Sequence, residues 1–283
     1  MKKIKSYAKI NLFLKVIGRQ KKYHKLYSLI SQIDLYDEIY IKENDYGNNK
    51  LFFSGKYKVN TQKNTVIDLL KILKKKFPIL RNKYFNIHIK KNIPNGSGLG
   101  GASSNATAIF NFIKKKYKLK ISIKRTHKLL SLIGKDCPLF LNQKVKIIKS
   151  HGENFTELSG NLKLHILLIY PNIVLSTKKV FYNLKKISNI SQKKGIDLND
   201  KTNLFKICKF YGNDLLSPAL KIEPRLKILL NLINKINDSI FYSMTGSGSA
   251  FFIIFSKKKS LLNAQKMIKK QGNKPWTKIV KTI

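Results

Sequence analysis

Short segments of the chain alternate apolar and polar residues, a pattern that predicts strands with one buried face. In residues 85–89 the apolar Phe85, Ile87 and Ile89 are each separated by a polar residue. Residues 165–170 are almost wholly apolar, as expected for a strand covered on both faces. A turn is expected to interrupt the second extended region near Asp34 and Asp37. Strands are predicted in residues 4–17, 29–41, 51–53, 85–89, 165–170, 239–244, 250–255 and 277–282, with shorter strand-like segments between 145 and 165.

Other segments carry apolar residues at helical spacing. Val66, Leu69, Leu70 and Leu73 share one helical face, and Pro78 ends that helix. Helices are predicted near residues 65–77, 106–113, 122–133, 177–187, 201–210, 223–236 and 260–270. Because strands and helices mix without regular βαβ alternation, the pattern favours an α+β protein of two domains, residues 1–155 and 156–283.

The composition is that of a globular protein, but the charge is extreme. Of the 283 residues, 57 are Lys or Arg and 14 are Asp or Glu, a formal net charge of +43. Such charge is typical of nucleic-acid or anionic-membrane binders. It also results from compositional bias, since Lys, Asn and Ile are all in excess. We favour bias and expect no specific nucleic-acid partner, because the lysines recur throughout the chain without a nucleic-acid-binding motif.

Cysteine usage and hydropathy indicate the compartment. Cys137 and Cys208 are the two cysteines of the sequence, which is no disulfide framework and fits a reducing compartment. Lys9, Asn11 and Lys15 interrupt the apolar stretch near the start, which argues against a secretory leader. No apolar run approaches the ~20 residues that span a bilayer. We therefore expect a soluble cytoplasmic protein without membrane attachment.

One dense glycine cluster lies between a predicted strand and a predicted helix. Glycines let backbone N–H groups face an anion, and the helix N-terminus adds its positive dipole end, so the cluster predicts a phosphate site. The alternative is a turn that packs two elements closely. The spacing fits neither the P-loop nor the dinucleotide fingerprint. The cluster consists of Pro94, Asn95, Gly96, Ser97, Gly98, Leu99, Gly100, Gly101, Ala102, Ser103 and Ser104.

Residues 94–107 resemble the P-x-G-x-G-L-G-G-x-S-S-N-A-T box of the GHMP kinases. Three further segments resemble motifs of that family in the required order: residues 8–14 its opening strand, residues 134–140 its G-x-D-V-P-F-F segment, and residues 244–250 its C-terminal glycine motif. The resemblance implies a two-domain fold, with an N-terminal α/β domain that binds ATP and a C-terminal ferredoxin-like domain.

The resemblance also implies the reaction, transfer of the γ-phosphate of ATP to an alcohol. In that mechanism Asp136 takes the proton of the attacking hydroxyl, and Lys9 neutralises charge near the transferred group. Asn64 aligns with a position near the adenine. Mg2+ is expected with ATP, through Ser103 or Ser104, although no carboxylate cluster in the sequence fixes a metal site.

Residues 19–26 resemble an R-x-x-x-Y-H-x-L segment of the GHMP kinases that phosphorylate the 2-hydroxyl of 4-diphosphocytidyl-2-C-methyl-D-erythritol. Lys22 stands where those enzymes carry glycine. Residues 34–37 resemble their I-x-L-x-D segment. The resemblance implies a small-molecule cytidine diphosphate substrate, with Tyr23 stacking on the cytosine and His24 bonding its edge. Asn11 and Thr177 align with substrate-contacting positions.

Two alternatives stay open at this point. Another GHMP kinase, of the homoserine or mevalonate type, would keep the glycine loop but has no reason to keep Tyr23 and His24. A nucleic-acid-binding protein on this fold would explain the charge but not the presence of Lys9 and Asp136. The sequence leaves the oligomeric state undetermined.

Overall fold

The computed structural model describes the chain except residues 21–22, 58, 60–63, 151–153, 191–194 and 272–273, and it also excludes the side chains of Gln20 and Tyr23. The chain forms two compact units that interleave along the sequence. Unit 1 comprises Met1–Ala8, Leu35–Asn95 and Gly100–Asn142, and unit 2 comprises Lys9–Asp34, Gly96–Leu99 and Gln143–Ile283. The boundary between domains near residue 155 stays a prediction.

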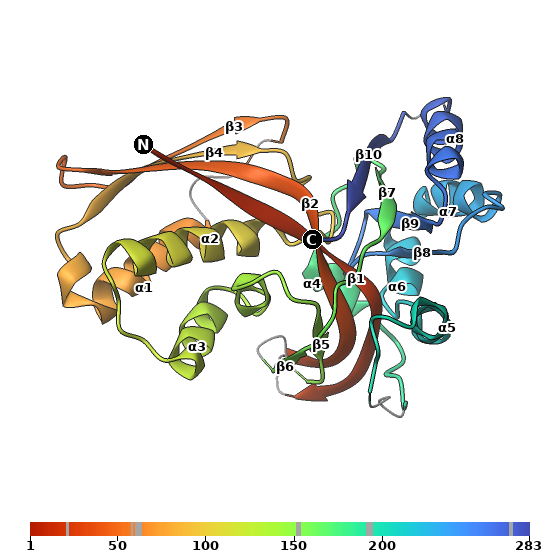
Figure 1. Cartoon of the computed structure of the whole chain (residues 1–283), viewed down its shortest axis with the longest axis horizontal. Coiled ribbons are helices and arrows are strands. Elements are labelled where there is room, and N and C mark those ends of the chain that lie inside the picture. Colours follow the sequence, from red (N-terminus) through yellow and green to blue (C-terminus); the bar gives the residue numbers. More distant parts are fainter. Residues whose placement is uncertain (21–22, 58, 60–63, 151–153, 191–194, 272–273) are drawn as a thin grey trace. The chain divides into compact units, whose positions relative to one another are not determined.

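Strands and helices form two layers in unit 1 (Figure 1). The long strands β1 (Lys2–Gln20) and β2 (Tyr23–Asn44) contribute residues to both units. In unit 1, β4 (Tyr84–Lys91) pairs antiparallel with β2 and parallel with β3 (Lys50–Gly55). The buried face of β2 and β4 packs against α1 (Thr65–Lys76), α2 (Gly101–Lys116) and α3 (Ile123–Ile133). Two 3-10 turns, η1 (Pro78–Leu80) and η2 (Cys137–Phe140), complete the unit.

The predicted turn near Asp34 and Asp37 is wrong, because β2 continues through both residues. Asp37 is fully buried, pairs with Lys91, and accepts backbone N–H bonds from Asn92 at 2.7 Å and Ile93 at 2.8 Å. Asp34 accepts the backbone N–H of Lys281 at 2.9 Å. These carboxylates bond partners far away in the sequence, whereas an Asp in a turn bonds the backbone two residues on.

The second half of the chain forms a ferredoxin-like arrangement within unit 2. Four antiparallel strands lie in the order β10 (Trp276–Lys281), β7 (His165–Tyr170), β9 (Phe251–Phe255), β8 (Phe241–Met244). Helices connect β7 to β8, and α8 (Lys258–Lys269) connects β9 to β10, which is the βαββαβ order of that fold. Strand β7 is interior and buried from Ile166 to Tyr170, as predicted for residues 165–170. Two short strands, β5 (Lys146–Ile148) and β6 (Phe155–Glu157), extend from β2.

The helices between β7 and β8 differ in part from the prediction. They are α4 (Thr177–Tyr182), α5 (Lys201–Tyr211), α6 (Leu216–Ile222) and α7 (Leu226–Asn234). The helix predicted over 177–187 ends at Tyr182, and α6 was not predicted. Pro218 argued against a helix here, because proline usually breaks helices. In α6 it lies in the first turn, where its missing N–H costs no intrahelical bond.

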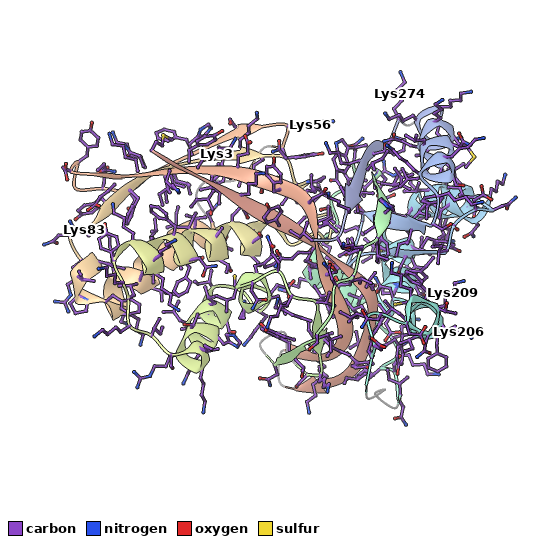
Figure 2. All side chains as sticks on the ribbon, in the orientation of Figure 1. Lys3, Lys56, Lys83, Lys206, Lys209 and Lys274 are labelled. Atoms are coloured by element: carbon purple, nitrogen blue, oxygen red, sulfur yellow. The ribbon has the colours of Figure 1, made fainter. Side chains whose placement is uncertain are left out.

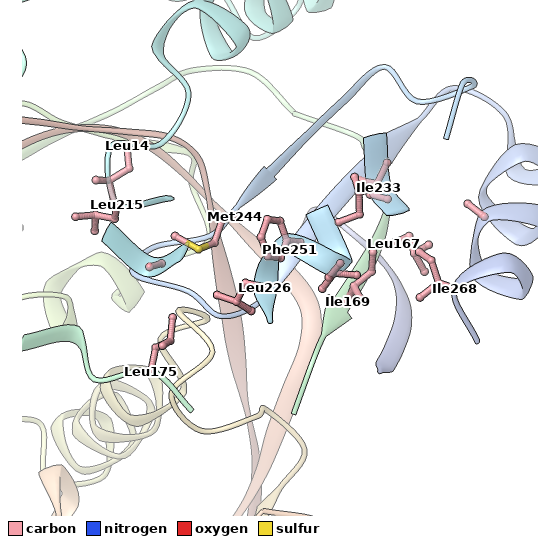
Figure 3. Close-up of a cluster of buried hydrophobic side chains, with 14 of the residues drawn as sticks. Leu14, Leu167, Ile169, Leu175, Leu215, Leu226, Ile233, Met244, Phe251 and Ile268 are labelled. Carbon is pink, nitrogen blue, oxygen red and sulfur yellow. The ribbon is translucent and has the colours of Figure 1, made fainter. Parts of the chain in front are cut away.

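Figure 3 shows the apolar core of unit 2. Leu167, Ile169 and Phe251 of the sheet contribute to a buried cluster together with residues of α7 and α8. Leu14 on β1 and Met244 at the end of β8 belong to the same cluster. Burial of a leucine or methionine side chain contributes about 1.5–3 kcal/mol, so this core anchors the chain segments that continue into the candidate site.

Candidate active site

The predicted phosphate loop connects the end of β4 to the start of α2. Gly96, Gly98 and Gly100 have φ values of +59°, +77° and +75°, the left-handed region that favours glycine. Gly100 is the N-cap of α2, and no side chain caps the helix. The N–H donors of the first turn have no partner inside the helix, so this end is suited to an anion.

The middle of the loop packs closely on the C-terminal glycine segment, Thr245–Ser249, within unit 2. The backbone N–H groups of Ser249 and Ala250 donate to the carbonyls of Gly96 at 3.3 Å and Ser97 at 3.1 Å. A Cβ on Gly98 would lie 2.1 Å from the carbonyl oxygen of Thr245. The sequence left open whether the glycines bind phosphate or allow two elements to pack closely. At Gly98, the close packing against Thr245 explains the glycine.

Lys9 lies where three segments of unit 2 meet. Its backbone N–H donates to the Leu99 carbonyl at 3.0 Å, and its ammonium donates to Asn11 Oδ1 at 2.5 Å. The Asn11 backbone N–H in turn donates to Thr245 Oγ1 at 3.0 Å. A Cβ on Gly246 would lie 3.2 Å from the Lys9 ammonium nitrogen. The opening strand, the glycine loop and the C-terminal glycine segment thus converge on one buried cation.

Asp136 lies in unit 1, at the N-cap of η2, and its carboxylate does not cap that turn. Thr107 of α2 donates to the Cys137 carbonyl at 2.8 Å, which ties this corner to α2. The neighbouring thiol of Cys137 is fully buried, and burial raises its pKa to about 11, so it packs and is not reactive. Because Lys9 and Asp136 belong to different units, their cooperation stays a prediction.

The remaining candidates of unit 1 lie at the N-termini of α1 and α2. Asn64 caps α1, since its Oδ1 accepts the Val66 N–H at 2.9 Å, and the adjacent Thr65 hydroxyl donates to the Ala102 carbonyl at 3.1 Å. The Ser104 hydroxyl is buried and bonded to Ser6 Oγ at 2.7 Å and the Tyr7 carbonyl at 2.6 Å. Ser104 is therefore occupied by protein partners.

The part of the chain that the structure describes contains no group of three or more His, Cys, Asp or Glu side chains able to hold a metal ion. It likewise contains no helix with the length and hydropathy needed to cross a bilayer.

Two of the predicted substrate residues of unit 2, His24 and Thr177, lie at α4. The His24 ring stacks on Phe181 with ring centroids 4.8 Å apart and planes 27° apart. Burial, and secondarily the charge of Arg19, lowers the pKa of His24, which favours the neutral imidazole. Thr177 shares a 2.9 Å hydroxyl–hydroxyl bond with Ser247. Lys22 and the side chain of Tyr23 lie outside the described residues.

Three residues of this region were not predicted from sequence: Phe181, Thr245 and Ser247. Phe181 follows Thr177 by four residues on one helix, a spacing that places both on the same face. That four-residue spacing could have identified Phe181 from the sequence. Thr245 and Ser247 lie within the recognised C-terminal glycine motif, but their partners on β1 and α4 follow only from the structure.

Comparison with known proteins identifies similar chains over the full length. Residues 64–142 match the family model of the GHMP kinases N terminal domain. The 4-diphosphocytidyl-2-C-methyl-D-erythritol kinase of Pelagibacter ubique is 37% identical over 282 residues, covering 99% of each chain. The enzyme of the same name from Prochlorococcus marinus strain MIT 9301 is 32% identical and covers 97% of this chain and 93% of that protein.

Solved structures share the fold at lower identity. A 4-(cytidine 5'-diphospho)-2C-methyl-D-erythritol kinase superposes with a TM-score of 0.76 at 22% identity and covers 99% of both chains. The mevalonate kinase of L. major superposes with a TM-score of 0.70 at 12% identity, covering 100% of this chain and 96% of that one. The two-domain fold expected from the sequence is thereby confirmed.

Proposed function

The chain belongs to the 4-diphosphocytidyl-2-C-methyl-D-erythritol kinases of the GHMP kinase family, and we propose that it transfers the γ-phosphate of ATP to the 2-hydroxyl of that substrate. The product is a precursor in non-mevalonate isoprenoid synthesis. The observation that carries the proposal is the convergence on Lys9 of the opening strand, the glycine loop and the C-terminal glycine segment.

The glycine loop is suited to the phosphates of ATP. The uncapped start of α2 offers backbone N–H donors and the positive end of the helix dipole, both of which stabilise anions. The bond from Thr65 to Ala102 joins the start of α1 to that of α2. Asn64, the N-cap of α1, is thereby held beside the loop, which supports a place near the nucleotide.

In the proposed reaction the substrate hydroxyl attacks the γ-phosphorus, and ADP leaves with the bridging oxygen. Asp136 accepts the hydroxyl proton, and its carboxylate is not engaged in capping η2. Lys9 stabilises the negative charge on the transferred group. Asn11 orients the ammonium through Oδ1, and Asn11 is itself held by Ser28 Oγ at 2.9 Å. Most of the rate enhancement in phosphoryl transfer comes from such positioning and electrostatics.

Recognition of the cytidine is proposed for the region around His24. A neutral imidazole both donates and accepts hydrogen bonds, which suits a reader of the polar edge of cytosine. Tyr23 supplies a stacking face, and Phe181, packed against His24, supplies a second aromatic side chain. Thr177 and Asn11 are proposed to contact the rest of the substrate.

Mg2+ is proposed to accompany ATP. Mg2+ in kinase sites is held largely by phosphate oxygens and water, with one or two carboxylates. The absence of a three-residue ligand cluster among the described residues is compatible with that mode. Because Ser104 is bonded to Ser6 and Tyr7, Ser103 is the better candidate of the two serines for a contact with the metal.

The basic surface is proposed to reflect composition and not a nucleic-acid function. The labelled lysines in Figure 2 belong to both units and to unrelated elements, from Lys3 on β1 to Lys209 on α5 and Lys274 before β10. Several acidic residues are paired with lysines, as Glu43 is with Lys83 and Lys116. A cytoplasmic location is likewise a proposal.

The proposed reaction is tested by incubating the protein with ATP, Mg2+ and 4-diphosphocytidyl-2-C-methyl-D-erythritol and following the product by 31P NMR. We expect one new phosphomonoester signal that shows coupling to the carbon bearing the 2-hydroxyl, together with stoichiometric release of ADP. ATP hydrolysis without that signal would contradict the proposed acceptor.

A further inference from the structure

Asn213, in the segment between α5 and α6, bonds on both sides of Thr245. Its amide Nδ2 donates to the Met244 carbonyl at 2.7 Å and to the Gly246 carbonyl at 2.9 Å, while its Oδ1 accepts the Leu215 N–H at 2.9 Å. Both protons of the amide are used. One side chain therefore fixes the carbonyls that precede and follow Thr245.

The segment that carries Asn213 is attached to β1, the strand of Lys9 and Asn11. The Leu14 N–H donates to the Gly212 carbonyl at 2.8 Å, and the Asp214 N–H donates to the Leu14 carbonyl at 2.9 Å. The Asp214 carboxylate also pairs with Lys15 and accepts the Val16 N–H at 2.7 Å. The Asn213 segment thus links β1 to the C-terminal glycine segment through hydrogen bonds.

Thr245 and Gly246 lie next to Asn11 and the proposed catalytic cation, Lys9. Thr245 Oγ1 accepts the Asn11 N–H at 3.0 Å, and the position of a Cβ on Gly246 is 3.2 Å from the Lys9 ammonium nitrogen. A shift of the Thr245–Gly246 backbone therefore moves both the neighbour of Lys9 and the partner of Asn11.

We propose that Asn213 is a positioning residue for phosphoryl transfer, which acts by holding Thr245 and Gly246 against Lys9 and Asn11. The inference rests on the proposed function. An amide is the neutral side chain that can donate to two carbonyls and accept a third bond. Aspartate at this position keeps the size and the acceptor but removes both donors.

The test compares Asn213→Asp with Asn44→Asp, a matched control in unit 1. Asn44 also donates twice, to the Asn48 carbonyl at 3.2 Å and to Asn86 Oδ1 at 2.8 Å, and accepts the N–H two residues on, from Tyr46, at 2.9 Å. Both variants lose two donors and gain one negative charge. Steady-state kcat, the KM of each substrate, and the melting temperature are measured for the wild type and both variants.

We expect kcat of Asn213→Asp to fall at least about tenfold, with both KM values within about threefold of wild type, because a small misplacement of reacting groups mainly slows chemistry. Asn44→Asp should lower the melting temperature similarly but keep kcat within about twofold of wild type. Asn213→Ser, which adds no charge and is too short to reach both carbonyls, should reproduce the kcat loss.

Several outcomes overturn the inference. If the wild type is active and Asn213→Asp or Asn213→Ser keeps a near-wild-type kcat per folded molecule, the positioning role is refuted but the proposed function is not. An equal loss of kcat in Asn44→Asp has the same consequence. If Asn213→Asp does not fold, Asn213→Ser decides the question at a temperature below its unfolding transition; if neither variant folds, Asn213 is a stability residue and the inference is wrong. A wild type that does not phosphorylate the substrate refutes the proposed function, and this inference with it.

Discussion

Replacing Gly98 with alanine adds one atom, the Cβ, and we expect that atom to distort the phosphate loop. Gly98 has a φ of +77°, and the added Cβ would lie 2.1 Å from the Thr245 carbonyl oxygen. Gly47 provides a matched control, because its φ is +70° and an added Cβ would meet nothing within 4 Å. Both substitutions carry the left-handed backbone penalty, about 1–2 kcal/mol, but only Gly98→Ala adds a collision.

The size of the effect follows from the geometry. Real Cβ contacts essentially never fall below 3.0 Å, so the loop and Thr245 must separate by about 0.9 Å. A displacement of about 1 Å in an active site costs about 10²-fold in rate. Since Gly98 precedes the N-cap of α2 by two residues and packs against Thr245, a partner of Asn11, kcat/KM for ATP should fall by about that factor.

The assay is steady-state ADP release coupled to NADH oxidation, with thermal unfolding measured in parallel. Gly47→Ala should lower the melting temperature by a few degrees and leave kcat/KM for ATP within about twofold of wild type. If Gly98→Ala retains a kcat/KM for ATP like that of Gly47→Ala, the close approach of the two glycine segments has no part in ATP use.

Four further predictions concern single side chains and the surface. Asp136→Asn should lower kcat about 10²–10⁴-fold while the affinity for ATP, measured by calorimetric titration, stays within about twofold; near-normal kcat would exclude Asp136 as the proton acceptor. Tyr23→Ala should raise KM for the cytidine substrate about 5–150-fold, as expected for lost base stacking, while Tyr23→Phe should be nearly silent. Because the pKa of His24 is lowered, its imidazole is neutral above pH 7, and KM for this substrate should rise only as the pH falls below the ordinary histidine range; a profile unchanged in His24→Ala would assign the titration elsewhere. Finally, RNA and DNA should bind weakly without sequence preference, with affinity that collapses as salt rises in fluorescence anisotropy; selective binding that survives high salt would assign the charge a function.

The sequence was informative where a residue's role depends on its near neighbours. The alternation around Ile87 and the apolar run at 165–170 predicted strands that the structure confirms. A strand with one buried face alternates apolar and polar residues, and a strand buried on both faces is apolar throughout. The spacing of glycines predicted the loop before α2. Phe181 was also within reach, since it lies one helical turn beyond Thr177.

The sequence was less informative where a side chain bonds a distant backbone. Asp37 resembled a turn residue, but its partners are the N–H groups of Asn92 and Ile93. Asn213 had no sequence signal at all, because it bonds the carbonyls of Met244 and Gly246, and every residue has a carbonyl. Such bonds depend on how the segments pack, which neither periodicity nor motif spacing specifies.

The central claim is that this chain is a kinase selective for a cytidine-bearing alcohol. The most direct test compares kcat/KM, at saturating ATP and Mg2+, for 4-diphosphocytidyl-2-C-methyl-D-erythritol and for 2-C-methyl-D-erythritol 4-phosphate, which has the same acceptor hydroxyl without the cytidine. Homoserine and mevalonate serve as acceptors of other GHMP kinases. We predict a preference of at least about 10²-fold for the cytidine-bearing substrate, with stacking and edge hydrogen bonds each contributing. Equal kcat/KM for the two erythritol substrates, or faster phosphorylation of homoserine or mevalonate, would contradict the account.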